Sequence, residues 1–187
     1  MKNSRLKSLL LNYYPAEAEE KRFKDQMLEF IQTHDACFER SLLAGHITAS
    51  CWLLNQGGTH ALLLHHRKLD RWFQLGGHCD GDPNVLAVAI KEAQEESGIF
   101  GIQAVTGDIF DIDIHLIPEN SKERAHLHYD VRFLLQVNSE EEPSKNIESK
   151  QLKWVGKNPD DLPTNSLSIL RMHQKWTSQL HHQNHPL

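Results

Sequence analysis

The chain has 187 residues, which is enough for one domain with a small terminal extension. Hydrophobic residues make up 39% and charged residues 24%, so a packed core is expected and wholesale disorder is excluded. The net charge of −5 argues against a protein that binds long nucleic acids through their phosphates. A small nucleotide remains a possible substrate, because bound cations supply local positive charge.

Cysteine use and hydropathy bear on the compartment. The three cysteines, Cys37, Cys51 and Cys79, are an odd number and widely spaced, which disfavours a disulfide framework. No stretch approaches the roughly 20 apolar residues that span a bilayer, and no signal peptide is recognisable. We therefore expect a cytoplasmic protein without a membrane partner.

The first half of the chain predicts helix and then strands. Apolar residues at helical spacing predict an amphipathic helix over residues 15–34, within an N-terminal helical extension of residues 1–40 that packs on a domain of residues 41–187. Residues 46–54 and 61–64 read as a hairpin around the turn signal of residues 55–58. Trp72 and Phe73 are then expected in a polar loop, and Leu75-Gly76-Gly77 is expected to open the next loop.

The second half begins with the clearest helix. Asp82 is predicted as its N-cap, Pro83 as its first residue and Gly98 as its left-handed end. Strands are expected within residues 102–116, 127–137 and 152–155, with an acidic loop at 139–145 and a last helix at 166–180. Strands that alternate with helices in this way predict an α/β or α+β fold.

Three carboxylates crowd the end of the central helix. Glu92, Glu95 and Glu96 stand at i, i+3 and i+4 and therefore share a face. Such like-charge pairs each cost roughly 0.2–0.5 kcal/mol on a bare helix, and the helix dipole disfavours anions in its last turns. A bound Mg²⁺ would reverse that cost, since it prefers oxygen ligands. The alternative is a solvated acidic surface.

The surrounding segment resembles the Nudix box, G-x5-E-x7-R-E-U-x-E-E-x-G-U, where U is aliphatic. Residues 77–99 read GHCDGDPNVLAVAIKEAQEESGI. Matches at full spacing are Gly77, Glu92, Glu95, Glu96, Gly98 and Ile99, with Ala93 as a small residue at the first U position. Pro83 replaces the first Glu and Lys91 replaces the Arg. Lysine keeps the charge of that arginine but not its bidentate fork.

The resemblance implies both a fold and an activity. The fold would be a Nudix-type α-β-α sandwich with a mixed central sheet, as a monomer or a homodimer. Glu92 and Glu96 would be the principal ligands of Mg²⁺ or Mn²⁺, helped by Glu95 and the Gly77 carbonyl, and Lys91 would orient these carboxylates. The reaction would be attack of water on a phosphorus atom of a small diphosphate substrate. Glu148 and Trp154-Val155 weakly resemble the ending of many members.

Four histidines form a second group of candidates. They are His46, His78, His126 and His128. His126 and His128 alternate on one strand and so point to the same face. Imidazole suits zinc, manganese, iron or nickel better than magnesium. The group is therefore a candidate second metal site near the carboxylates, and the alternative is a set of separately hydrogen-bonded side chains.

These positions also resemble isopentenyl-diphosphate isomerase, a Nudix relative with a metal bound by His and Glu. Residues 46–50 resemble its strand H-L-x-F-S, and Gly77-His78 resembles its G-H step. The catalytic Cys of that enzyme would fall at Gly76 and its catalytic Glu at His128, so both proton-moving groups are replaced here.

Two further residues are candidates for substrate binding. Arg132 alternates in phase with Asp130 and the strand histidines, so it either pairs with Asp130 or contacts a substrate phosphate. Trp72 either stacks on a ring of the substrate or packs in the core.

Three functions follow from these patterns. The first is metal-dependent hydrolysis of a nucleoside-diphosphate-linked or other small diphosphate compound. The second is an isomerase-like activity on an allylic diphosphate, which the residues at 76 and 128 disfavour. The third is a diphosphate-binding module with weak or no catalysis, which retention of the three glutamates disfavours.

Overall fold

The computed structural model describes residues 3–119 and 124–179 of the chain. Four helices lie within these residues, together with a short 3-10 turn, η1, at Pro159–Asp161: α1 Ser4–Asn12, α2 Ala18–Thr33, α3 Val85–Ser97 and α4 Leu167–Gln179. The strands of the same residues are β1 Gly45–Leu54, β2 Ala61–His66, β3 Arg71–Phe73, β4 Leu75–His78, β5 Ile102–Ile117, β6 His126–Val137 and β7 Ser149–Val155.

These strands form one mixed sheet. Its main order is β3-β2-β1-β6-β5, while β4 pairs with β1 and β7 pairs with β2. β1 and β6 run parallel, and the other pairs are antiparallel. All ten residues of β1 are buried, as expected for a central strand that is covered on both faces. The predicted mixed sheet is confirmed.

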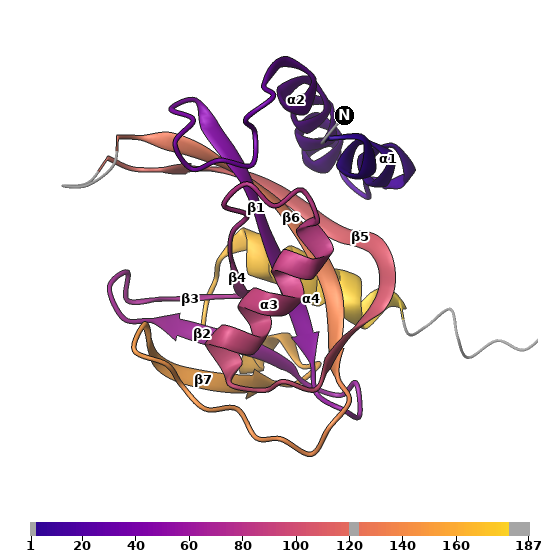
Figure 1. Cartoon of the computed structure of the whole chain (residues 1–187). Helices are drawn as coiled ribbons and strands as arrows, with labels where there is room; N and C mark the ends of the chain where they lie inside the picture. The colour runs from indigo at the N-terminus through magenta and orange to yellow at the C-terminus, as the bar shows by residue number, and fades with distance from the viewer. Residues whose placement is uncertain (1–2, 120–123, 180–187) are drawn as a thin grey trace, which may run out of the picture.

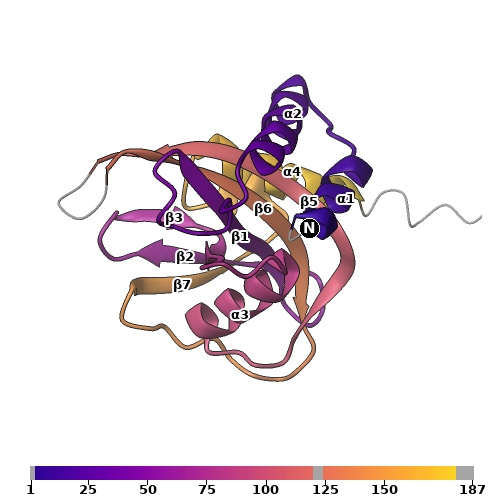
Figure 2. The ribbon, with the colours of Figure 1, turned by 45° about the horizontal axis from the view of Figure 1, so that its top comes forward.

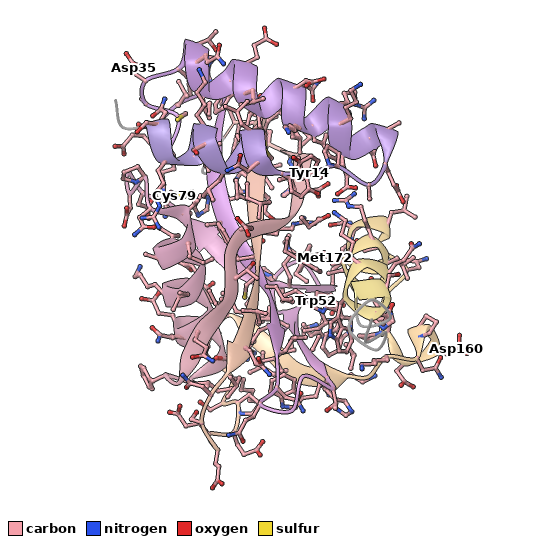
Figure 3. The ribbon with its side chains drawn as sticks, turned by 90° about the vertical axis from the view of Figure 1, so that its right-hand side faces the viewer. Tyr14, Asp35, Trp52, Cys79, Asp160 and Met172 are labelled. Carbon is pink, nitrogen blue, oxygen red and sulfur yellow. The ribbon has the colours of Figure 1, made fainter. Side chains whose placement is uncertain are left out.

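Helices cover both faces of the sheet, which confirms the α-β-α sandwich. Successive residues of β1 point to opposite faces, so Cys51 joins the core with Ala89 and Ala93 of α3, while Trp52 joins a second core with Met172 of α4. Figure 3 shows the sheet between these two helices, with Trp52 beside Met172.

The N-terminal helices lie beside β5 (Figures 1 and 2). Leu10 of α1 and Met27 of α2 are fully buried in the larger core. Glu20 of α2 is also buried, and its carboxylate accepts hydrogen bonds from Lys175 of α4 and from the Tyr13 hydroxyl. The division into residues 1–40 and 41–187 stays a prediction. Within the described part of the chain, no helix is long and apolar enough to cross a membrane.

Several local predictions hold and others are wrong. The hairpin of β1 and β2 is confirmed, and Gly98 ends α3 with a φ of 72°. The N-cap of α3 is Asn84, because Asp82 lies before the helix and accepts the Asn84 N–H at 2.8 Å. Trp72 and Gly76 lie on strands β3 and β4 instead of loops.

Candidate active site

Two of the three carboxylates of α3 lie against β4. The buried Ala89 and Ala93 fix α3 on the sheet, so the side of the helix that carries Glu92 and Glu96 faces the glycines of β4. Glu96 Oε2 accepts the Gly76 N–H at 2.8 Å. Glu92 and Glu96 are half-buried, and Glu95 is exposed.

Gly77 has no side chain, and this leaves room for the Glu92 carboxylate. A Cβ atom added to Gly77 would lie 2.3 Å from Glu92 Oε2, so the carboxylate occupies the space that a side chain would fill. The backbone of Gly77 and this carboxylate therefore adjoin, as expected if both contribute oxygen ligands to one cation. Gly76 is equally constrained, because its Cβ would lie 2.2 Å from Ser50 Cβ.

The carboxylates are held where their charge is unfavourable. Burial raises the pKa of Glu96 to about 8, and the charges of Glu92, Glu148 and Glu95 add to the effect, while the Gly76 hydrogen bond opposes it. Burial also raises the pKa of Glu92. A divalent cation would remove this penalty, and the all-oxygen donor set fits Mg²⁺ or Mn²⁺.

Lys91 lies beside two of these groups. Its Nζ is 3.5 Å from Glu95 Oε1 and 3.7 Å from Glu92 Oε1. The charges of Glu92 and Glu95 raise the pKa of Lys91. Lysine in place of the arginine of the box therefore still neutralises part of the carboxylate charge, but from an exposed position.

No nearby aspartate replaces the glutamate missing at Pro83. Asp80 accepts two hydrogen bonds from Arg40, at 2.5 and 2.6 Å, and Asp82 accepts the Asn84 N–H. The charge of Asp80 still helps to raise the pKa of Glu92, and a further carboxylate acts on this site from a distant part of the chain. The negative charge of Glu148 helps to raise the pKa of Glu96, and the Glu148 carbonyl accepts the Arg67 N–H at 2.8 Å. Its only sequence signal is the weak resemblance near residue 148.

Arg132 does not face a substrate site. Its guanidinium is fully buried and donates to Asp130 at 2.7 Å, Asp111 at 2.9 Å, Asp113 at 3.0 Å and Ser168 at 2.6 Å. The pairing with Asp130 is therefore the alternative that the structure contains. The arginine ties β5, β6 and α4 together, and a contact with a substrate phosphate stays a prediction.

Trp72 also lies away from the carboxylates. It stacks on His65 with ring centroids 4.8 Å apart and packs against the core that contains Trp52 and α4. The opposite face of the sheet carries α3, with Glu92 and Glu96. Core packing is thus the alternative observed, and stacking on a substrate stays a prediction.

The four predicted histidines do come together. The ring centroid of His46 lies 5.0 Å from His78, 5.0 Å from His126 and 4.7 Å from His128. His115, which no sequence pattern indicated, also adjoins the cluster, with its ring centroid 5.4 Å from that of His128. Burial lowers the pKa of His46 to about 4, and burial together with the neighbouring rings lowers that of His128 further.

The histidine cluster lies on the opposite face of the sheet from the carboxylates. His46 and His128 have the same parity along their strands as Trp52 and Leu134, which pack toward α4. The predicted convergence of the four histidines is thus present in the structure, and their binding of a metal stays a prediction.

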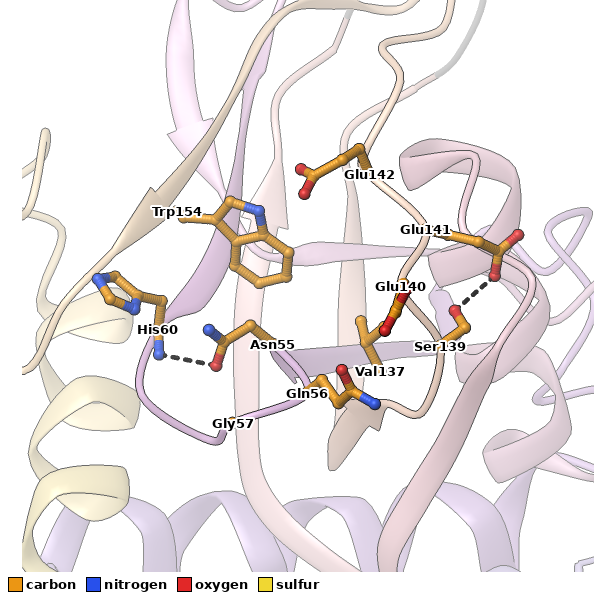
Figure 4. Close-up of a pocket in the computed structure, with 10 residues that line it drawn as sticks. All are labelled: Asn55, Gln56, Gly57, His60, Val137, Ser139, Glu140, Glu141, Glu142 and Trp154. Atoms are coloured by element: carbon orange, nitrogen blue, oxygen red, sulfur yellow. Dashed lines mark hydrogen bonds between the residues drawn. The ribbon is translucent and has the colours of Figure 1, made fainter.

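An open pocket lies at another end of the sheet (Figure 4). It has a volume of about 560 Å³, and its lining includes Trp154, Glu140, Glu141 and Glu142 but none of the α3 carboxylates. The Trp154 ring lies across the pocket from the Glu142 carboxylate in Figure 4. The pocket therefore lies apart from the paired, half-buried glutamates of α3.

Comparison with known proteins identifies the family. The model of the NUDIX domain family matches residues 45–169, which is more than half of the chain. The chain belongs to the Nudix family. The matched residues include α3, β4 and the histidine cluster. A search of curated protein sequences finds no match.

Solved structures share the Nudix fold. An Ap4A hydrolase from C. elegans in a binary complex is 17% identical with a TM-score of 0.58, covering 73% of this chain and 98% of that one. The dihydroneopterin triphosphate pyrophosphohydrolase of E. coli is 16% identical with a TM-score of 0.54, covering 71% and 95%. A MutT protein from Methanosarcina mazei Go1 is 17% identical with a TM-score of 0.51, covering 74% and 97%.

Proposed function

We propose that this Nudix hydrolase is magnesium-dependent and cleaves a phosphoanhydride bond in a nucleoside-diphosphate-linked or other small diphosphate substrate. One observation carries the proposal: Glu92 and Glu96 are half-buried, have raised pKa values and lie against Gly77 and Gly76. A bound cation would explain why the helix keeps these mutually repelling carboxylates.

Glu92 and Glu96 would hold the cation, with Glu95 and the Gly77 carbonyl as further ligands. The bound cation neutralises phosphate oxygens and lowers the pKa of a coordinated water. The Gly76 N–H fixes the Glu96 carboxylate through its 2.8 Å hydrogen bond, so the ligand is oriented before substrate arrives. Lys91 balances the charge of Glu92 and Glu95.

Glu148 is our candidate for the group that accepts the proton of the attacking water. It is a carboxylate outside α3 whose charge acts on Glu96. A base must lie within reach of that water, so a position beside the proposed ligand is required.

The structure also weighs against the isomerase alternative. A Cβ at position 76 would lie 2.2 Å from Ser50 Cβ and 2.8 Å from the Ala49 carbonyl oxygen. The catalytic cysteine of the isomerase falls at this position, and here the strand pair leaves no room for a side chain. The buried free thiols of Cys37, Cys51 and Cys79 support a reducing compartment such as the cytoplasm.

The test is product release from a panel of diphosphate substrates with Mg²⁺ or Mn²⁺. The panel includes Ap4A and dihydroneopterin triphosphate, on which the structurally similar hydrolases act, as well as isopentenyl diphosphate. We expect metal-dependent cleavage that Glu96→Gln and Glu92→Gln each reduce by at least about 100-fold, because each variant removes a proposed metal ligand. Glu29→Gln, on the exposed side of α2, is the matched control.

Isomerisation of isopentenyl diphosphate without phosphate release would support the isomerase reading. Binding of substrates without turnover would support the binding module. Glu148→Gln tests the proton acceptor separately. If Glu148 is the base, this variant lowers kcat and leaves Mn²⁺ binding unchanged, whereas a residue that supports the metal would change both.

A further inference from the structure

A second site is built from histidines at β1, β4 and β6. His46 comes from β1, His78 from β4 and His128 from β6, and the three strands are neighbours because β1 pairs with both others. His46 is paired directly with His128 across the parallel strands. Strand pairing, not loop conformation, therefore sets the relative positions of the three rings.

Both ring nitrogens of His46 are buried without hydrogen-bond partners among the described residues. The ring is buried, with 2% of its surface exposed. A neutral imidazole carries one donor and one acceptor, and a buried polar group without a partner costs about 1–3 kcal/mol. Such a group in a folded protein requires an explanation, and a bound ion is one.

Nitrogen atoms of the three rings converge on one small volume. One ring nitrogen from each of His46, His78 and His128 lies within 4.8 Å of the other two. Zinc–nitrogen bonds are about 2.0–2.1 Å and the usual geometry is tetrahedral, so nitrogen ligands of one ion would be roughly 3.4 Å apart. The three nitrogens would therefore have to approach one another by up to about 1.4 Å to bind a single ion.

His126 supports this arrangement from the edge of the cluster. Its Nδ1 lies 2.8 Å from the Arg124 carbonyl oxygen, which only an N–H can satisfy, so Nε2 carries the lone pair. That Nε2 is 3.2 Å from Nε2 of His128. It accepts a hydrogen bond from the His128 N–H when no metal is bound. A backbone carbonyl that fixes the tautomer of a ring is the usual outer partner of metal-binding histidines.

We propose that His46, His78 and His128 bind one divalent transition-metal ion, such as Zn²⁺. Nitrogen donors alone select a transition metal over Mg²⁺. The ion would connect β1, β4 and β6 on the face of the sheet opposite to the α3 carboxylates. Because it binds only the folded chain, it stabilises the fold.

The proposal is tested on untagged full-length protein prepared without a nickel column. The protein is stripped with a chelator, and Co²⁺ and Zn²⁺ are then titrated while bound metal, visible Co²⁺ absorption and the unfolding temperature are measured. We expect about one Co²⁺ per chain and a higher unfolding temperature, with affinity reduced at least about 100-fold in His46→Gln and His128→Gln. His60→Gln is the matched control, because His60 is an exposed histidine at the start of β2.

Glu96→Gln separates this site from the proposed catalytic site. It should lose hydrolysis and still bind Co²⁺ at the histidines. Wild-type protein that takes up no transition metal, or His46→Gln that binds it as tightly as wild type, would overturn the proposal. If the histidine variants fail to fold, X-ray absorption of the zinc-loaded wild type decides: three imidazoles at about 2.0–2.1 Å support the site, and oxygen donors alone refute it.

Discussion

Glu96→Gln should stabilise the metal-free protein at high pH while it removes activity. Burial raises the pKa of Glu96 from 4.5 to about 8 in the folded state. Between pH 4.5 and about pH 8, Glu96 holds a proton in the folded protein that it releases in the unfolded chain. Stability therefore falls as the pH rises through this window, and above it the folded protein carries the full cost of a buried charge. Glutamine keeps the shape and the acceptor for the Gly76 N–H but carries no charge.

The size of the effect follows from the pKa difference. Each pKa unit between the folded and unfolded states corresponds to about 1.4 kcal/mol, so the rise from 4.5 to about 8 sets an upper limit of about 5 kcal/mol. Water reaches part of this half-buried carboxylate and screens it, so we expect a gain of about 2–3 kcal/mol above about pH 8 and almost none below about pH 4.

Urea unfolding in the presence of EDTA measures the effect across this pH range. Glu29→Gln is the control, because Glu29 is exposed on α2 and its removal should not change the pH dependence. Added Mg²⁺ should reverse the order, since it stabilises the wild type through Glu96 and the variant much less. The reasoning is refuted if Glu96→Gln shows the same stability as wild type, or lower, at high pH without metal.

Three other substitutions test the rest of the structure. Gly77→Ala places a Cβ 2.3 Å from Glu92 Oε2, so Mn²⁺ affinity should fall at least about tenfold in an EPR titration; unchanged affinity would remove Glu92 from the ligand set. Arg132→Met removes one partner each from the buried Asp111, Asp113 and Asp130 and should cost about 3–5 kcal/mol in urea unfolding; a neutral result would show that the remaining partners suffice, among them Arg171 and Lys175, which also donate to Asp111. Lys91→Ala should change stability by less than about 1 kcal/mol because its ion pairs are exposed, yet lower kcat; equal activity would deny Lys91 an orienting role.

The carboxylate helix was predictable because its information is local. The i, i+3, i+4 spacing of Glu92, Glu95 and Glu96 fixes a common face on any helix, and Gly98 ends the helix with a φ of 72° as its position suggests. The alternation of His126 and His128 fixes a common face in the same way. Neither prediction depends on how distant segments pair.

The errors arise where distant segments decide the structure. Arg132 meets Asp111 on β5 and Ser168 on α4, and no local pattern shows that three elements enclose its guanidinium. Trp72 turns toward α4 because β3 pairs with β2 in one particular register. Glycine-rich β4 carries no side-chain periodicity from which a strand could be recognised, so its pairing with β1 was invisible in the sequence.

Strand β4 explains why residues adjacent in sequence serve two sites. Consecutive residues of a strand point to opposite faces, so Gly77 meets Glu92 on the α3 side while His78 joins His46 on the other. The sequence predicted a second site near the carboxylates, and the pleat of the strand places the two sets of side chains on opposite faces. The carboxylates and the histidines are therefore chemically distinct sets, one all oxygen and one all nitrogen, and a substitution that empties one should leave metal binding at the other intact.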